Sequence, residues 1–139
     1  MSNFTGHCHC GALQFTFTTA KSAAELPLRA CACSFCRRHG TLTTSDPEGL
    51  VRFAVRDPAA LHRYEFGLRT AAYLICRNRG TYIGAVASDI DGDRALVNVN
   101  CFDDRSGFAR DAASVNYDGE TEPARRARRK SGWTPAVWR

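Results

Sequence analysis

The chain has no apolar run that approaches the roughly 18 residues of a membrane-spanning helix. Its first residues, MSNFTGHCHCGALQ, are polar from the start and lack the apolar core of a secretory signal peptide. These two absences exclude the common sequence signals for membrane insertion and secretion. We therefore expect a soluble, cytoplasmic protein with no membrane partner.

The sequence also lacks internal repeats, low-complexity linkers and any sign of a second domain. Its 139 residues suit one domain with a single buried core. Hydrophobic residues make up 44% of the chain, which excludes a protein that is disordered by composition. We expect one domain over residues 1–139, with a basic C-terminal extension at 118–139.

Acidic residues are absent from the stretch 123–139, although it holds six of the 19 lysines and arginines. The rest of the chain keeps 13 basic residues against 14 acidic ones, so its net charge is −1. A basic run can neutralise nucleic-acid phosphates, but the nearly neutral body and the scarcity of aromatic residues around the run disfavour that partner. We expect this stretch to pack onto the body through Trp133 and Trp138, with its arginines on the surface, where they could lie near a pocket for an anionic ligand.

Apolar and polar residues alternate with a period of two in several short segments, as in half-buried strands. The expected strands are 12–19, 50–55, 61–66, 71–76, 80–87 and 95–102. Helix is expected only just after Cys33 and over 121–130, where Thr121 is a candidate N-cap and Gly132 follows the end. The pattern predicts a mainly β domain with short helical segments.

The seven cysteines are closely grouped. They are Cys8 with Cys10, Cys31 with Cys33 and Cys36, and the more isolated Cys76 and Cys101. In a reducing compartment, such groups indicate metal binding or catalysis more often than disulfides, and the odd number leaves one cysteine unpaired. If a C-x-C segment is extended, its two sulfurs point to the same side and can reach one ion. Thiolates favour zinc over magnesium or calcium, so we expect Cys76 to join a zinc site and Cys101 to be a small buried side chain.

Four segments carry a family resemblance. GHCHCGALQFTF, CACSFCRRHG, YLICRNRGTYIG and VNVNCFDD resemble the glutathione-dependent formaldehyde-activating enzymes, a family that includes centromere protein V. The resemblance covers about residues 6–104. It implies a zinc-bearing β-tent fold and a carbon–sulfur lyase that joins a thiol such as glutathione to a small aldehyde, giving an S-hydroxymethylglutathione-type adduct.

The resemblance also implies two metal sites. Cys8, Cys10 and Cys76, with one further cysteine, would form a closed structural zinc site, and Cys31, Cys33 and Cys36 would form a catalytic site of three thiolates. The third motif departs from the family pattern C-x-x-C-G, because Arg79 stands where the fourth structural cysteine belongs. A guanidinium cannot coordinate zinc. Water, His7 or His9 could complete the site, the site could be empty, or the three cysteines could remain neutral thiols, so we expect one or two zinc ions per chain.

Three thiolates on one zinc ion give a centre with a net charge of −1 and one open position. A soft ligand suits that position, and a substrate thiol is such a ligand. Arg37 and Arg38 could bind a carboxylate of an anionic thiol, and His39 could transfer a proton.

The sequence is compatible with two other functions. One is a thiol- or metabolite-binding module with zinc but no turnover, and the other is a nucleic-acid-binding protein. The sequence does not determine the oligomeric state, a homo-oligomer included.

Overall fold

The computed structural model describes residues 1–138, which form eleven β-strands, two α-helices and four short 3-10 helices. The strands are β1 (Ser2–His7), β2 (Leu13–Thr19), β3 (Arg29–Cys31), β4 (Thr43–Thr44), β5 (Leu50–Val55), β6 (Leu61–Tyr64), β7 (Ala72–Cys76), β8 (Tyr82–Asp89), β9 (Gly92–Asn98), β10 (Ala113–Val115) and β11 (Thr134–Trp138). The helices are α1 (Ser34–His39) and α2 (Glu122–Gly132), and the 3-10 helices are η1 (Ala23–Glu25), η2 (Pro58–Ala60), η3 (Val99–Cys101) and η4 (Ser106–Phe108). The expected mainly β class is confirmed.

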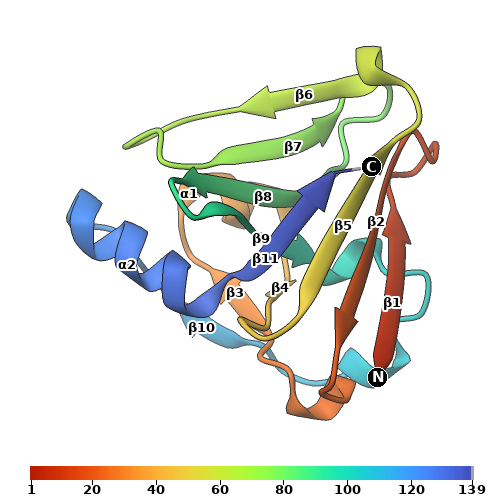
Figure 1. Cartoon of the computed structure of the whole chain (residues 1–139), viewed down its shortest axis with the longest axis horizontal. Coiled ribbons are helices and arrows are strands. Elements are labelled where there is room, and N and C mark those ends of the chain that lie inside the picture. Colours follow the sequence, from red (N-terminus) through yellow and green to blue (C-terminus); the bar gives the residue numbers. More distant parts are fainter. Residues whose placement is uncertain (139) are drawn as a thin grey trace.

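All the described strands join one sheet, and β9 is its junction (Figure 1). The main path runs β1-β2-β5-β11-β9-β4-β3-β10. The antiparallel strands β6, β7 and β8 leave this path as a branch, because β8 also pairs with β9. The sheet therefore has two arms, and β6 and β7 of the branch lie at the top of Figure 1.

The predicted strands correspond to β2, β5, β6, β7, β8 and β9. The last prediction extended too far, because 99–101 form the 3-10 helix η3. Five strands were not predicted. Among them, β1 (SNFTGH) carries few apolar residues, and β3, β4 and β10 have only two or three residues each, so their pairing comes from neighbouring strands rather than from a local pattern.

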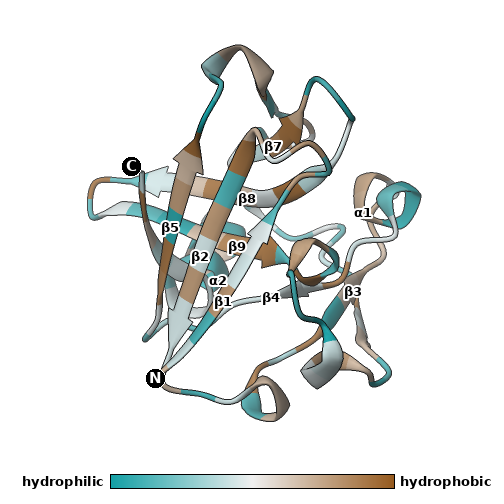
Figure 2. Ribbon diagram, turned by 90° about the vertical axis from the view of Figure 1, so that its right-hand side faces the viewer, coloured by the Kyte–Doolittle hydropathy of each residue, from teal (hydrophilic) through white to brown (hydrophobic). Residues whose placement is uncertain are grey.

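The main hydrophobic core lies between the two arms. Alternate residues of β2 point into it, so that Leu13, Phe15 and Phe17 are buried, and brown and teal segments follow one another along β2 in Figure 2. Phe53 of β5 and Leu74 of β7 belong to the same cluster. The alternation that was read from the sequence thus sets which face of β2 is buried.

A second, smaller apolar cluster surrounds Cys36. Its buried members are Phe35, Cys36, Ala71, Tyr82, Ala85 and Trp133, and Cys31 and Cys33 pack against them. Trp133 is only 4% exposed. The C-terminal stretch therefore contributes directly to the surroundings of the second cysteine group.

The stretch after α2 packs onto the body, as predicted. Strand β11 lies parallel to β5 on one side and antiparallel to β9 on the other, so it is an interior strand of the sheet. The ring of Trp138 lies 4.9 Å from that of Phe53, and its Nε1–H donates to Asp93. The docking predicted for Trp133 and Trp138 is confirmed, although the strand itself was not predicted.

Helix α2 begins at the expected N-cap, where Thr121 Oγ1 accepts a hydrogen bond from the Ala124 N–H at 3.2 Å. Its end differs slightly from the prediction, because Gly132 is still helical and Trp133 is the C-cap. The expectation that all arginines of this stretch lie on the surface is wrong for Arg129, which is 6% exposed. Its position one turn before Trp133 puts its guanidinium 4.7 Å from the indole ring.

Most of the positive charge of α2 is paired. Arg125 and Arg128 both contact Glu120, and Arg126 contacts Glu122. Lys130 forms an ion pair with Asp91. These contacts leave little unpaired positive charge on the helix for a polyanion. Within the described part of the chain, neither helix combines the length and apolar character that a membrane crossing requires.

The buried indole of Trp133 gives a first prediction. Trp133→Ala removes a large side chain that supports both β11 and the smaller cluster, so the free energy of unfolding should fall by about 3–5 kcal/mol. Urea denaturation followed by circular dichroism measures this loss. Ile90→Ala is the matched control, because Ile90 is fully exposed between β8 and β9. A loss below about 1 kcal/mol for Trp133→Ala would contradict the structure.

Candidate metal centres

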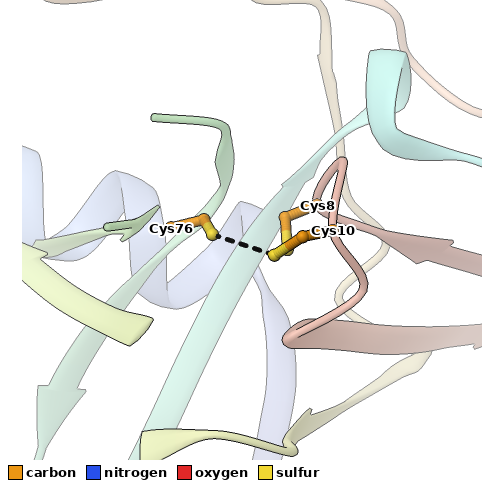
Figure 3. A group of neighbouring side chains, drawn as sticks. All are labelled: Cys8, Cys10 and Cys76. Carbon is orange, nitrogen blue, oxygen red and sulfur yellow. Dashed lines mark hydrogen bonds between the residues drawn. The ribbon is translucent and has the colours of Figure 1, made fainter. Parts of the chain in front are cut away.

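The first cysteine group joins the turn between β1 and β2 to the end of β7 (Figure 3). The sulfur of Cys10 lies 3.7 Å from that of Cys8 and 3.5 Å from that of Cys76. Cys8 and Cys76 are fully buried, whereas Cys10 is exposed. Three sulfur atoms within 4.8 Å of one another are close enough to share one metal ion.

Local backbone geometry holds this group together. The segment around Cys10 is a turn rather than the extended chain considered from the sequence, and the Gly11 N–H donates to the Cys8 carbonyl at 3.1 Å. The Leu13 N–H donates to the Cys8 sulfur at 3.3 Å. On the other side, the Gly80 N–H closes a turn onto the Cys76 carbonyl at 2.7 Å. The sulfurs converge because two turns meet, not because of the alternation of a strand.

The electrostatics of the first group favour Cys10 as the thiolate. A backbone hydrogen bond from Ala12, assisted by the Asn78 amide, lowers the pKa of Cys10 to about 7. Burial raises the pKa of Cys76. Cys10, the exposed sulfur, is therefore more acidic than Cys76. A metal ion would displace the protons of all three sulfurs.

No histidine or carboxylate among residues 1–138 lies close enough to complete this group. His7 is engaged elsewhere, with Nε2 3.1 Å from a carboxylate oxygen of Asp103 and Nδ1 at the Cys8 carbonyl. Arg79 is exposed in the turn that follows Cys76. Of the alternatives left open by the sequence, completion by His7 is therefore disfavoured, and the group offers three sulfur ligands.

The second cysteine group lies where β3 runs into α1. Cys31 ends β3, Cys33 is the N-cap of α1, and Cys36 lies in the first turn of that helix. The Cys36 N–H donates to the Cys33 sulfur at 3.3 Å, which is a helix cap made by sulfur in place of the usual oxygen. The three sulfurs lie within 4.8 Å of one another. The C-x-C-x-x-C spacing thus folds into a second group of three ligands.

The pKa values of these three thiols are shifted in different directions. A hydrogen bond from Cys36 lowers the pKa of Cys31 to about 5. The same contact, together with burial, raises the pKa of Cys36, and burial raises that of Cys33. Cys31 is therefore the most acidic of the three thiols.

A cavity of about 50 Å³ lies beside this second group. Its lining residues are Arg29, Cys31, Cys36, Thr43, Tyr73, Tyr82, Leu96, Val115, Tyr117, Arg128, Arg129 and Trp133. Tyr82 is 2% exposed, and its hydroxyl has no hydrogen-bond partner among the described residues. Burial raises the pKa of Tyr82 well above its usual value, so the phenol stays protonated and can donate a hydrogen bond. The cavity therefore combines sulfur ligands with polar groups that lack partners.

The structure places Arg37, Arg38 and His39 away from this cavity. Arg38 and His39 line a different groove of about 650 Å³, together with Phe35. Arg38 donates to the Ser34 carbonyl at 3.2 Å, and His39 Nδ1 lies 2.9 Å from the Phe35 carbonyl. The substrate-binding role of these residues stays a prediction.

The basic residues on the cavity wall were not predicted as site residues. Arg29 comes from β3, and Arg128 and Arg129 come from α2. The basic run of α2 is visible in the sequence. The position of α2 beside the cysteines, however, depends on the pairing of β11 within the sheet. The position of Arg29, two residues before Cys31, was the only local signal.

Cys101 belongs to neither group. It is 8% exposed, and its sulfur lies 3.5 Å from the Tyr82 carbonyl. Burial raises the pKa of Cys101 to about 12, which keeps it a neutral thiol. This environment agrees with the expectation of a small buried side chain.

Comparison with known proteins finds one solved structure with a similar fold. No protein-family model matches the chain, and no curated protein matches it. A crystal structure of a Rhodobacter sphaeroides protein, determined as a structural-genomics target, is similar to it, with 28% sequence identity and a TM-score of 0.60. The match covers 80% of this chain and 99% of that chain. Its description names no activity, so the similarity supports a shared fold and leaves the function to the site.

The first group has three sulfur ligands, and Arg79 stands where the family pattern has a fourth cysteine. This gives a second prediction. Arg79→Cys should supply a fourth thiolate at the turn after Cys76, raise the zinc content by one equivalent or tighten that zinc, and increase the melting temperature. Zinc content is measured by atomic emission and affinity by competition with a chelator. Arg77→Cys, in the same turn, is the control and should change neither quantity. Equal zinc binding by Arg79→Cys and the unmodified chain would contradict the prediction.

Proposed function

We propose that the chain is a zinc-dependent carbon–sulfur lyase that joins a small-molecule thiol, such as glutathione, to a small aldehyde. The observation that carries this proposal is the position of the Cys31, Cys33 and Cys36 sulfurs, which converge within 4.8 Å at the wall of a cavity. Three protein ligands beside open space are typical of a metal centre that receives an exogenous ligand. A closed structural site would place a fourth protein ligand there.

The donor set fits zinc. All three ligands are sulfurs, which a soft ion such as zinc prefers. Bound by three thiolates, zinc would keep one position for a soft ligand and would favour the thiolate form of a substrate thiol. The family resemblance of the four cysteine-bearing segments adds the aldehyde as the second reactant.

The reaction needs no oxidant or reductant. The thiol sulfur forms a bond to the aldehyde carbon, the C=O π bond breaks, and the proton lost by the thiol ends on the oxygen. The protein's own residues would position the reactants and exclude water. Tyr82 can donate a hydrogen bond to an oxygen atom in the cavity, because its hydroxyl has no partner among the described residues. Trp133 and Leu96 make part of the wall apolar.

Nucleic-acid binding is the weaker alternative. Four of the basic residues of α2 pair with acidic residues, and Arg129 is buried. Phosphate binding at this helix would require these pairs to break, whereas the thiol site needs no such change.

Replacement of a single sulfur tests the proposed function. Cys33→Ser should lose the zinc of the second group, because the hydroxyl is a poor ligand for a soft metal site. It should also bring the exchange between formaldehyde and its glutathione adduct, measured by NMR exchange spectroscopy, down to the uncatalysed rate. Cys101→Ser is the control and should keep both properties, since Cys101 lies outside the two groups.

Three results are informative. Full zinc content in Cys33→Ser would overturn the metal assignment. Zinc loss without any rate above background in the unmodified chain would overturn the lyase and leave a thiol-binding module. Zinc loss together with loss of an accelerated exchange supports the proposal.

A further inference from the structure

The cavity beside Cys31 and Cys36 contains positive charge that no acidic residue neutralises. Arg129 is 6% exposed, and one guanidinium nitrogen, Nη1, donates to the Thr70 hydroxyl, while Nε has no partner. Arg29 is partly buried and donates to the Ser45 hydroxyl at 2.9 Å. Neither arginine forms an ion pair with any carboxylate of residues 1–138. Buried charges are normally paired, so these two require an explanation.

The third arginine at the cavity is already satisfied. Arg128 contacts both carboxylate oxygens of Glu120 and lies over the Tyr117 ring, 3.5 Å from its centroid. Arg29 and Arg129 are therefore the two guanidiniums that remain available. Burial lowers the pKa of both, but guanidinium stays charged at neutral pH.

The charges and donors around the cavity favour an anionic ligand. Arg29 and Arg129 together contribute +2, whereas a zinc ion with three thiolates would contribute −1 and a substrate thiolate on that ion a further −1. These charges would balance, so a carboxylate is favoured by the directional N–H donors of the two guanidiniums rather than by an excess of charge. Among the residues that line the cavity, Arg129 Nε and the Tyr82 hydroxyl have no hydrogen-bond partner in the described part of the chain.

The size of the cavity limits the ligand. Its volume of about 50 Å³ holds a few heavy atoms, since a water-sized group occupies roughly 10–15 Å³ by this measure. A carboxylate with one or two carbons fits, whereas a whole tripeptide would have to remain mostly outside. The same small space touches Cys31, Cys36 and both arginines.

We propose that this cavity is a carboxylate subsite, in which Arg29 and Arg129 bind a carboxylate one or two carbons away from the group that meets the metal. This inference rests on the proposed function, because it describes what the thiol site accepts. The carboxylate can belong to the thiol itself, as in a short mercaptocarboxylate, or to the carbonyl compound with which the thiol reacts.

The test uses the full chain loaded with cobalt(II), whose visible spectrum reports ligand exchange at a thiolate site. Mercaptoacetate and 2-mercaptoethanol are titrated separately, and 2-mercaptoethanol is titrated again in the presence of acetate. Mercaptoacetate should bind on the order of tenfold more tightly than 2-mercaptoethanol. Arg129→Gln should bring this ratio close to one. Arg126→Gln, an exposed change on the same helix, should leave it unchanged.

Arg29→Gln is the second variant, and it tests the carboxylate subsite if Arg129→Gln does not give a folded chain. It should also reduce the preference for mercaptoacetate. If the two thiols bind equally but acetate strengthens binding of 2-mercaptoethanol, and the arginine variants abolish that effect, the subsite is supported and serves a carboxylate on the second reactant.

Two negative results are distinguishable. If both thiols change the cobalt spectrum with affinities that neither acetate nor the arginine variants alter, the carboxylate subsite is overturned and the thiol site stands. If neither thiol changes the spectrum of the cobalt-loaded chain, the proposed function fails, and the subsite fails with it.

Discussion

The pairing of β9 on both of its edges is the constraint on which the rest of the structure depends. One edge bonds to β8 and the other to β11 and β4, so this strand joins the two arms of the sheet. The approach to β8 is close, because a Cβ atom at Gly84 would lie 2.5 Å from the Leu96 carbonyl oxygen. Through β4, the strand also positions β3, which ends at Cys31.

The two cysteine groups are placed by different means. The first group depends on two turns that face each other, and its sulfurs are held by backbone N–H groups around Cys8 and Cys76. The second group depends on one short helix, whose N-cap is Cys33. The first ends at the exposed Cys10 with three ligands, whereas the second borders a cavity. Both groups offer three sulfur ligands, and the neighbouring cavity distinguishes the second from the first.

Charge around the second group comes from parts of the chain that are far apart in sequence. Arg29 precedes Cys31 by two residues, but Arg129 lies almost a hundred residues later and reaches the cavity only because Trp133 is buried and β11 is an interior strand. A basic C-terminal run that suggests a polyanion partner is instead mostly paired with acidic residues, and two of its arginines, Arg128 and Arg129, are part of the cavity wall. Whether a basic run can bind a polyanion therefore depends on how many of its side chains already form ion pairs within the protein.

Local patterns in the sequence determined the mainly β class, six of the strands, the N-cap at Thr121, the pair Cys8 and Cys10, and the trio Cys31, Cys33 and Cys36, because alternation, capping and short spacings act over a few residues. The place of Cys76 in the first group was implied by the family resemblance, not by spacing. Only the tertiary structure decided which basic residues meet the cysteines. Arg37 and Arg38 are neighbours of Cys36 in sequence, yet the helical geometry of α1 directs them away from the cavity, and Arg129 takes that place. The lateral pairing of β11 has no local sequence signature, since its partners β5 and β9 lie some forty or more residues earlier in the chain.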